Sequence, residues 1–312
     1  MRAAVLSAPG VPEPADFRDP EPTAEAAVVD VLAAPINNFD KALASGRHPL
    51  SPAAYPAVAG YDGVGRTADG RLVYFEAPVA PFGSMAERTL VDEARLIELP
   101  EGTDPAVAAV LGNAGAAGWL PLSWRAEVAA GETVAVLGAA GVVGSIALQA
   151  ALQLGVRDVV AIVRGDRQVE LAHALGATAT VDTAQHKTFD GLVAAMRKAA
   201  PDGFNVVIDY LWGATVAAAV DNAAVGARVV HVGAVTGDIS EIPGAVLRTR
   251  GIDIRGFAGY LVPRDIRVQA YLHQVALATQ QRLQIAVAPA PLEDLAAAWS
   301  HSPSTARTVV SP

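Results

Sequence analysis

The chain has 312 residues, 52% of them hydrophobic and 18% charged, so we expect two folded domains and exclude wholesale disorder. Its formal net charge is −9 without a block of basic residues, which argues against nucleic acid or a membrane as a partner. It contains no cysteine, which excludes disulfides, thiolate zinc sites and a cysteine nucleophile.

The N-terminal part, up to about Asp104, predicts an irregular β-rich domain. Met1–Ser7 lacks the long apolar run of a signal peptide and is typical of a first strand, so we expect a cytoplasmic location. Five prolines between Pro9 and Pro22 argue against early helices. The short apolar runs that follow are Ala26–Ala33, Arg71–Phe75 and Arg88–Val91.

From Asp104 to about Phe257, strand-like and helical segments alternate. The predicted strands are Thr133–Leu137, Val159–Val163, Ala179–Val181, Val206–Tyr210, Arg228–Val232 and Ile252–Phe257. The predicted helices between them are Val143–Leu154, Arg167–Leu175, Lys187–Ala199 and Ala214–Ala224. This alternation indicates the α/β class, with a doubly wound parallel sheet of the Rossmann type.

Thr133–Gly155 is uncharged and long enough to span a membrane. Its glycines and glutamines favour a buried strand, turn and helix instead. Beyond Phe257 we expect a helix over Pro263–Leu283, a short helix over Pro291–Trp299 and a closing strand over Arg307–Val310.

The strongest motif is the glycine-rich turn between the first of these strands and its helix. Ala139, Gly141 and Gly144 occupy the three glycine positions of the dinucleotide fingerprint, with alanine in the first. A pyrophosphate must approach the backbone N–H groups at the helix N-terminus, and small residues allow this. The predicted contacts are Ala139, Ala140, Gly141, Val142, Val143 and Gly144. The alternative is a tight turn that binds no ligand.

The end of the second strand favours NADP(H) over NAD(H). An NAD site usually has an acidic residue there, but the expected position falls at about Val163. Arg164 and Arg167 follow, and guanidinium groups suit a ribose 2′-phosphate. In the alternative, both arginines are solvated charges and Asp166 binds the ribose.

Several segments in chain order resemble motifs of the medium-chain dehydrogenase/reductases. They are Ala34–Pro49, Ala59–Gly65, Gly83–Arg88, Ala130–Gly144, Pro291–Trp299 and Arg307–Val310. The resemblance implies a GroES-like, β-rich substrate domain from residues 1–113, an inserted Rossmann domain from 114–257, and a segment, 258–312, that completes both. It also implies an active site in the cleft between the domains, with the backbone near Gly233 and Phe257 flanking the nicotinamide. It further implies a homodimer that pairs the edge strand Gly251–Gly259.

The zinc-binding members of this family hold their catalytic metal with Cys, His and Cys. The matching positions here are Asn37, Tyr61 and Asn113, none of which is a good zinc ligand. We therefore expect no metal, and we expect simple alcohol oxidation to be disfavoured. The zinc-free branch of the family contains quinone oxidoreductases and enoyl-thioester reductases, which reduce conjugated acceptors.

The candidate catalytic residues follow from the same resemblance. His48 stands where the zinc-free relatives commonly have a tyrosine, and histidine can donate a proton near neutral pH. Tyr61 is the second candidate donor, Asn37 is expected near the acceptor, and Asp40 is expected to hold the loop or to act with them. The alternatives are a solvated loop residue for His48 and aromatic packing for Tyr61. His231 is interpreted as a core residue or a backbone bridge.

The sequence thus predicts an NADPH-dependent, zinc-independent oxidoreductase for a small quinone or α,β-unsaturated carbonyl substrate. The alternatives are a specialised ene-reductase or cyclase on the same fold, or an NADPH-binding protein without catalytic activity.

Overall fold

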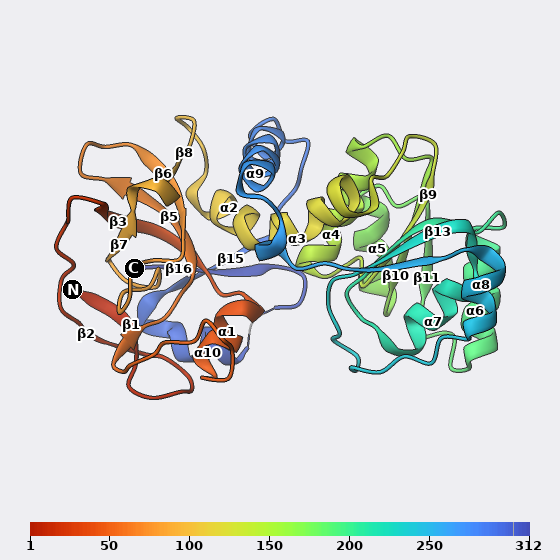
Figure 1. Ribbon diagram of the computed structural model, residues 1–312, viewed down its shortest axis with the longest axis horizontal. Helices are drawn as coiled ribbons and strands as arrows, with labels where there is room; N and C mark the ends of the chain where they lie inside the picture. Colours follow the sequence, from red (N-terminus) through yellow and green to blue (C-terminus); the bar gives the residue numbers. More distant parts are fainter. Residues whose placement is uncertain (302) are drawn as a thin grey trace. The chain divides into compact units, whose positions relative to one another are not determined.

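The computed structural model describes residues 1–301 and 303–312. The chain forms two compact units, one made of Met1–Ala114 with Tyr271–Pro312 and the other of Gly115–Ala270 (Figure 1). The second unit is therefore inserted into the sequence of the first. Each unit is described separately below.

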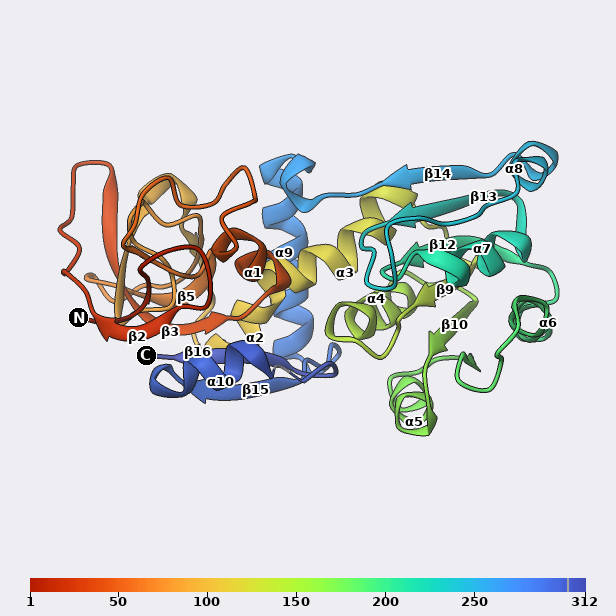
Figure 2. The ribbon, with the colours of Figure 1, turned by 90° about the horizontal axis from the view of Figure 1, so that it is seen from below.

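The inserted unit is built around a six-stranded parallel sheet. Its strands are β9 (Thr133–Leu137), β10 (Asp158–Val163), β11 (Ala179–Asp182), β12 (Phe204–Asp209), β13 (Ala223–His231) and β14 (Asp253–Gly256). The strand order is β11-β10-β9-β12-β13-β14, which Figure 2 shows from β10 to β14. The order reverses between β9 and β12, as in doubly wound nucleotide-binding sheets. The predicted Rossmann-type fold is confirmed.

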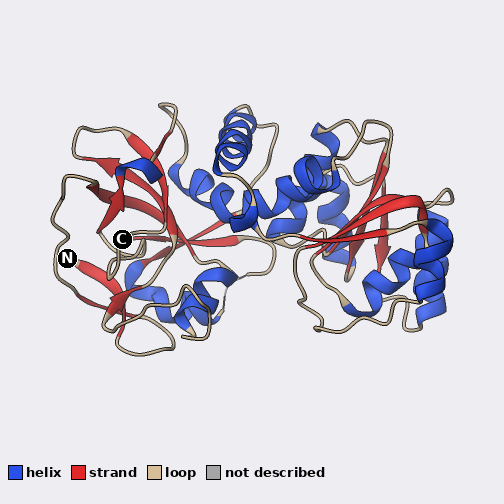
Figure 3. Ribbon diagram, in the orientation of Figure 1, coloured by secondary structure: helices blue, strands red, loops and turns tan. Residues whose placement is uncertain are grey.

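Helices cover both faces of this sheet (Figure 3). They are α4 (Val142–Gln153), α5 (Asp166–Ala174), α6 (Phe189–Ala199), α7 (Gly213–Asp221) and α8 (Gly244–Arg250), with a 3₁₀ turn at Gly259–Leu261. All five residues of β9 are buried, as expected for a parallel strand that is covered on both faces. The segment Thr133–Gly155 is therefore a strand, a turn and a helix, as predicted.

The other unit contains two β-sheets. Their strands are β1 (Arg2–Leu6), β2 (Glu13–Asp16), β3 (Ala26–Pro35), β4 (Ala57–Val58), β5 (Asp62–Thr67), β6 (Leu72–Glu76), β7 (Arg88–Asp92), β8 (Ile97–Glu98), β15 (Val287–Pro291) and β16 (Arg307–Ser311). The larger sheet runs β15-β16-β3-β5-β6-β8, with β7 also paired to β3, and the smaller runs β2-β1-β4. The C-terminal β16 pairs antiparallel with β3, so the end of the chain completes the N-terminal sheet.

The helical segments of this unit are short. They are α1 (Asn38–Ala44), η1 (Glu93–Arg95), α2 (Pro105–Val110), η5 (Leu292–Asp294) and α10 (Leu295–Ser300). The segments that join the two units along the chain are the π-helical η2 (Leu111–Gly115), then α3 (Ala116–Leu120) and the π-helical η3 (Pro121–Ala126), and later α9 (Arg264–Thr279).

Pro105–Ala126 is long and apolar enough to cross a membrane by length and composition. Within its most apolar window, 67% of the residues are buried inside the structure. A helix in a protein core passes the same test, so this segment is weak evidence for a membrane span.

Candidate functional site

The turn between β9 and α4 is held by backbone hydrogen bonds. The N–H of Gly138 donates to the carbonyl oxygen of Ile162 at 2.9 Å, and the N–H of Gly141 donates to that of Gly138 at 3.0 Å. Gly138 has φ +81°, a left-handed conformation that favours glycine. Gly141 is the N-cap of α4, and no described side chain caps this helix. The first N–H groups of α4 are therefore available to an anion or to water.

Gly144 allows α4 to pack closely on the turn. A Cβ atom at Gly144 would lie 2.2 Å from the carbonyl oxygen of Gly138 and 2.8 Å from Cα of Ala139. Backbone atoms cannot yield to such contacts, so only glycine fits here. The structure brings the predicted fingerprint, from Ala139 through Ala140 and Gly141 to Gly144, into one turn at the carboxyl edge of the sheet.

The two predicted phosphate-binding arginines lie at the end of the neighbouring strand. Arg164 directly follows β10, and Arg167 lies in the first turn of α5. Both are exposed, and within the described residues neither guanidinium has an ion-pair or hydrogen-bond partner. Asp182, at the end of the neighbouring strand β11, is already engaged, because the N–H of Gly165 donates to its Oδ1 at 2.7 Å. This hydrogen bond is the main cause that lowers the pKa of Asp182.

A carboxylate and a histidine meet at the carboxyl ends of β12 and β13. Asp209 is fully buried, and its Oδ1 accepts the N–H groups of Leu211 at 3.0 Å and Trp212 at 2.9 Å. Its Oδ2 lies 3.1 Å from Nδ1 of His231, whose side chain is 32% exposed. Of the two alternatives predicted for His231, a core residue or a backbone bridge, the core residue is therefore wrong. His231 ends β13, and its ring lies against the carboxylate of Asp209 at the end of the neighbouring strand β12.

The two positions expected beside the nicotinamide lie next to this pair. The N–H of Gly233 donates to the carbonyl oxygen of Asp209 at 3.3 Å, and the N–H of Phe257 donates to that of His231 at 2.9 Å. Gly233 and Phe257 are thus fixed to the carboxyl edge of the same sheet.

In the other unit, Asp40 fixes the loops that carry the candidate catalytic residues. Asn37 is the N-cap of α1, and its N–H donates to Oδ2 of Asp40 at 2.7 Å. Oδ1 of Asp40 accepts the N–H of Tyr61 at 2.9 Å. Both oxygens of this buried carboxyl group therefore bind backbone, so Asp40 positions the loops.

A second buried carboxyl group, Asp62, was not singled out from the sequence. Its Oδ1 accepts from Nδ2 of Asn37 at 3.2 Å, and its Oδ2 accepts from the hydroxyl of Tyr74 at 3.1 Å. The backbone N–H of Asn113, in the π-helical turn η2, also donates to Asp62. A Cβ atom at the adjacent Gly112 would lie 2.3 Å from the ring of Tyr74, so this turn requires glycine. Two of the three positions matched to zinc ligands thus bind Asp62.

Burial changes the protonation of both carboxyl groups. It raises the pKa of Asp40 to about 6, against hydrogen bonds from Asn37 and Tyr61. Burial, together with the nearby Asp40, raises the pKa of Asp62 well above its ordinary value. The positive charge of Arg307, whose Nη1 donates to the carbonyl oxygen of Ile36 at 3.0 Å, opposes both shifts. The two groups interact, so they titrate as a pair.

His48 lies in the loop after α1 and is partly buried. Its Nδ1 accepts the N–H of Leu50 at 3.2 Å, and its own N–H donates to Oγ of Ser51 at 3.2 Å. Because Nδ1 is an acceptor, the neutral ring carries its proton on Nε2. His48 is therefore held as a hydrogen-bond donor through Nε2.

One aromatic ring connects the two candidate donors. The ring of Phe39 packs edge-on against His48, with centroids 5.2 Å apart, and edge-on against Tyr61 at 4.9 Å. The structure therefore brings Asn37, Asp40, His48 and Tyr61 together in this unit.

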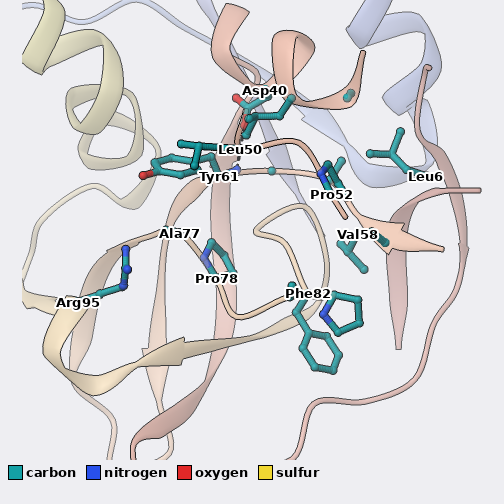
Figure 4. A pocket seen from close by; sticks show the side chains of 17 residues that line it. Leu6, Asp40, Leu50, Pro52, Val58, Tyr61, Ala77, Pro78, Phe82 and Arg95 are labelled. Carbon is teal, nitrogen blue, oxygen red and sulfur yellow. Dashed lines mark hydrogen bonds between the residues drawn. The ribbon is translucent and has the colours of Figure 1, made fainter. Parts of the chain in front are cut away.

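Tyr61 also borders a largely apolar pocket of about 390 Å³ (Figure 4). Figure 4 shows Asp40 beside Tyr61 and apolar side chains around the remaining wall, among them Leu6, Val58 and Phe82. Arg95 is the one cationic side chain among the lining residues, and its Nε donates to Asp92 at 3.3 Å. The pocket is large enough for a small organic ligand.

Comparison with known proteins agrees with this architecture. Residues 142–275 match a family model described as zinc-binding dehydrogenase. The mouse protein "Quinone oxidoreductase-like protein 2" is 30% identical over 178 residues, which are 57% of this chain and 50% of the relative. The chain thus spans about half the length of the curated relatives that it matches.

Several solved structures resemble the whole chain, among them two quinone oxidoreductases. The quinone oxidoreductase of Thermus thermophilus, solved also as a complex with NADPH, is 27% identical with a TM-score of 0.80, and the match covers 100% of both chains. The Escherichia coli quinone oxidoreductase complexed with NADPH is 20% identical with a TM-score of 0.85, again over 100% of both chains. The chain is therefore similar to zinc-binding dehydrogenases over residues 142–275 and to quinone oxidoreductase-like proteins over 178 residues, and it shares the fold of the quinone oxidoreductases.

The residues of the inserted unit fit a nicotinamide dinucleotide. The uncapped N-terminus of α4 and the space kept by Gly144 suit a pyrophosphate. Arg164 and Arg167, which have no partner in the described part of the chain, suit a phosphate on the ribose.

The same protein offers few metal ligands. Within residues 1–301 and 303–312, no group of three His, Asp or Glu side chains lies close enough together to hold a metal ion. Asn37 and Tyr61 stand at matched ligand positions, and neither residue type is a usual zinc ligand.

Proposed function

We propose that this protein is an oxidoreductase of the medium-chain dehydrogenase/reductase type that transfers a hydride from NADPH to a quinone or an α,β-unsaturated carbonyl compound without zinc. One observation carries the proposal. Among the described residues, the inserted unit has a glycine-rich turn without a side-chain cap beside two arginines without a partner, whereas the other unit gathers Asn37, His48 and Tyr61. These groups can polarise a carbonyl, and Asn37 and Tyr61 are not usual zinc ligands, which supports a reaction without zinc.

Two findings support NADPH as the cofactor. Arg164 and Arg167 have no protein partner in the described chain, and Asp182 is occupied by backbone N–H groups. The quinone oxidoreductases of Thermus thermophilus and Escherichia coli were both solved with NADPH. A free guanidinium pair next to the ribose site favours the extra phosphate.

The acceptor side supports a conjugated carbonyl as the substrate. NADPH, when bound, supplies the hydride. The chain must then polarise the carbonyl oxygen and provide a proton to the reduced product. Nε2 of His48 carries a proton that its loop does not use, and Tyr61 places a phenol next to it across Phe39. The apolar pocket beside Tyr61 suits the hydrocarbon part of such a substrate.

Turnover measurements test the proposed activity. We expect the purified protein to oxidise NADPH with members of a panel of quinones and enones, and a chelator should leave the rate intact. Metal analysis should find less than stoichiometric zinc. NADPH binding without turnover of any acceptor would favour a non-catalytic protein, and one tightly bound zinc per chain would refute the zinc-independent mechanism.

We also propose a homodimer formed through β14. This strand is the edge of the six-stranded sheet, and its Ile254 is 40% exposed. An unpaired edge strand is a liability that symmetric pairing removes. Light scattering at micromolar concentration should give twice the mass of the chain, and a monomer there would contradict the proposal.

A further inference from the structure

The pair formed by Asp209 and His231 has no part in the function proposed so far. The imidazole ring of His231 is only partly buried, because 32% of its side chain is exposed. It is also not free in solvent, because Nδ1 faces the fully buried carboxylate of Asp209. Trp212 packs on the ring with centroids 4.3 Å apart. Trp212 itself has φ +63°, a conformation that costs free energy for a non-glycine residue and persists where its surroundings impose it. The imidazole is therefore held in one place.

The partners of the ring decide its tautomer. Oδ1 of Asp209 binds two backbone N–H groups, and Oδ2 faces Nδ1 of His231 at 3.1 Å. A carboxylate has no proton to donate, so Nδ1 carries the proton of this hydrogen bond. Nε2 of the neutral ring is then an acceptor, and it has no hydrogen-bond partner within the described residues. This is the reverse of His48, whose Nε2 is a donor.

The strand order places the pair on the nicotinamide side of the sheet. Arg164 directly follows β10 on one side of β9, so the adenosine half with its phosphate would lie there. Asp209 and His231 end β12 and β13 on the other side of β9 (Figure 2). Neighbouring strands are about 4.8 Å apart, so the end of β13 lies about 10 Å from the end of β9, within reach of an extended dinucleotide. Phe257, expected beside the nicotinamide, is hydrogen-bonded to the backbone of His231.

We propose that Nε2 of His231 accepts a hydrogen bond from the amino group of the nicotinamide carboxamide, and that Asp209 keeps the ring in the tautomer that can accept it. The proposal rests on the nicotinamide cofactor proposed above. His231 is then a cofactor-binding residue, and Asp209 is a positioning residue that acts through it. The hydrogen bond would restrict rotation of the carboxamide and thereby the orientation of the ring face that gives up the hydride.

Binding of matched cofactor analogues tests this without any turnover. The probes are NADP⁺, its 3-acetylpyridine analogue, which has a methyl ketone in place of the carboxamide and so lacks the N–H, and adenosine 2′,5′-bisphosphate, which lacks the nicotinamide. We expect the wild type to bind NADP⁺ roughly three- to tenfold more tightly than the acetylpyridine analogue, the range of one net hydrogen bond. His231→Leu should bind both dinucleotides equally. Its affinity for the bisphosphate should be unchanged, which also shows that the unit is folded.

Two further variants show which residues cause the preference for NADP⁺ over the acetylpyridine analogue. Asp209→Asn presents an amide N–H to Nδ1 and so moves the ring proton to Nε2, while its oxygen still accepts the N–H groups of Leu211 and Trp212. It should lose the preference for NADP⁺ although the histidine remains. His173→Leu removes an exposed histidine of α5 in the same unit and should keep the full preference.

Each outcome of these binding measurements supports or contradicts one of the proposed roles. A wild type without preference between the two dinucleotides, or a His231→Leu variant that keeps the preference, overturns the role of His231 and leaves the proposed function standing. A preserved preference in Asp209→Asn overturns the role of Asp209. If the wild type binds none of the three probes, the proposed cofactor fails, and this inference fails with it.

Discussion

Replacing His48 by alanine should lower kcat with an enone about a hundredfold, while the dissociation constant of NADPH stays nearly unchanged. The loop holds Nε2 of His48 as a donor, because Nδ1 accepts from Leu50. Loss of that donor removes the hydrogen bond or proton given to the developing enolate. The measurement is steady-state kinetics with an enone, together with a titration of NADPH binding.

The acceptor class changes the expected result. A reduced quinone is already a stabilised phenolate that can take its proton from water, so His48→Ala should slow quinone reduction only slightly. His48→Tyr should recover part of the enone rate, and His301→Ala, at an exposed histidine of the same unit, should leave it unchanged. A normal enone rate in His48→Ala would remove His48 from the mechanism and leave Tyr61 as the candidate donor.

Replacing Arg164 and Arg167 together by alanine should weaken NADPH binding by tens- to hundreds-fold. Both guanidinium groups are exposed and unpaired within the described residues, so they are free to bind the 2′-phosphate through charge-assisted hydrogen bonds. NADH lacks that phosphate, and its affinity should change little. The measurement is the dissociation constant of each cofactor for the wild type and the double variant.

A matched control separates this effect from a general loss of positive charge. Arg197→Ala removes an exposed arginine of α6 that pairs with Asp221, and it should leave the preference for NADPH intact. Equal affinity of the wild type for NADPH and NADH would refute the choice of cofactor and would direct attention to Asp166 as a ribose ligand.

The sequence by itself determined the inserted fold and the dinucleotide turn. β9 has the predicted bounds, Thr133–Leu137, and α4 begins one residue before the predicted start. These features are local, since alternating apolar runs and closely spaced glycines set strand, turn and helix from neighbouring residues. The same local pattern predicted a strand, a turn and a helix for Thr133–Gly155 instead of a membrane-spanning helix.

Short elements without a strong period were missed. The helix α1 has only seven residues, and α8 follows a proline-containing loop, so neither spans enough turns to show a helical pattern. The helical stretch from Pro105 to Ala126 was not assigned, and two π-helical turns interrupt its regular spacing.

Only the tertiary structure decided which polar side chains meet. Asp62 binds Asn37 from another loop and Tyr74 from the neighbouring strand, and Arg307 reaches the same region from the last strand of the chain. Asp209 and His231 are 22 residues apart and meet because β12 and β13 end side by side. No sequence period encodes such contacts, since they depend on strand order and register. The residues around His231 alone therefore predict a core residue or a backbone bridge, although the adjacent strand supplies the carboxylate that orients its ring.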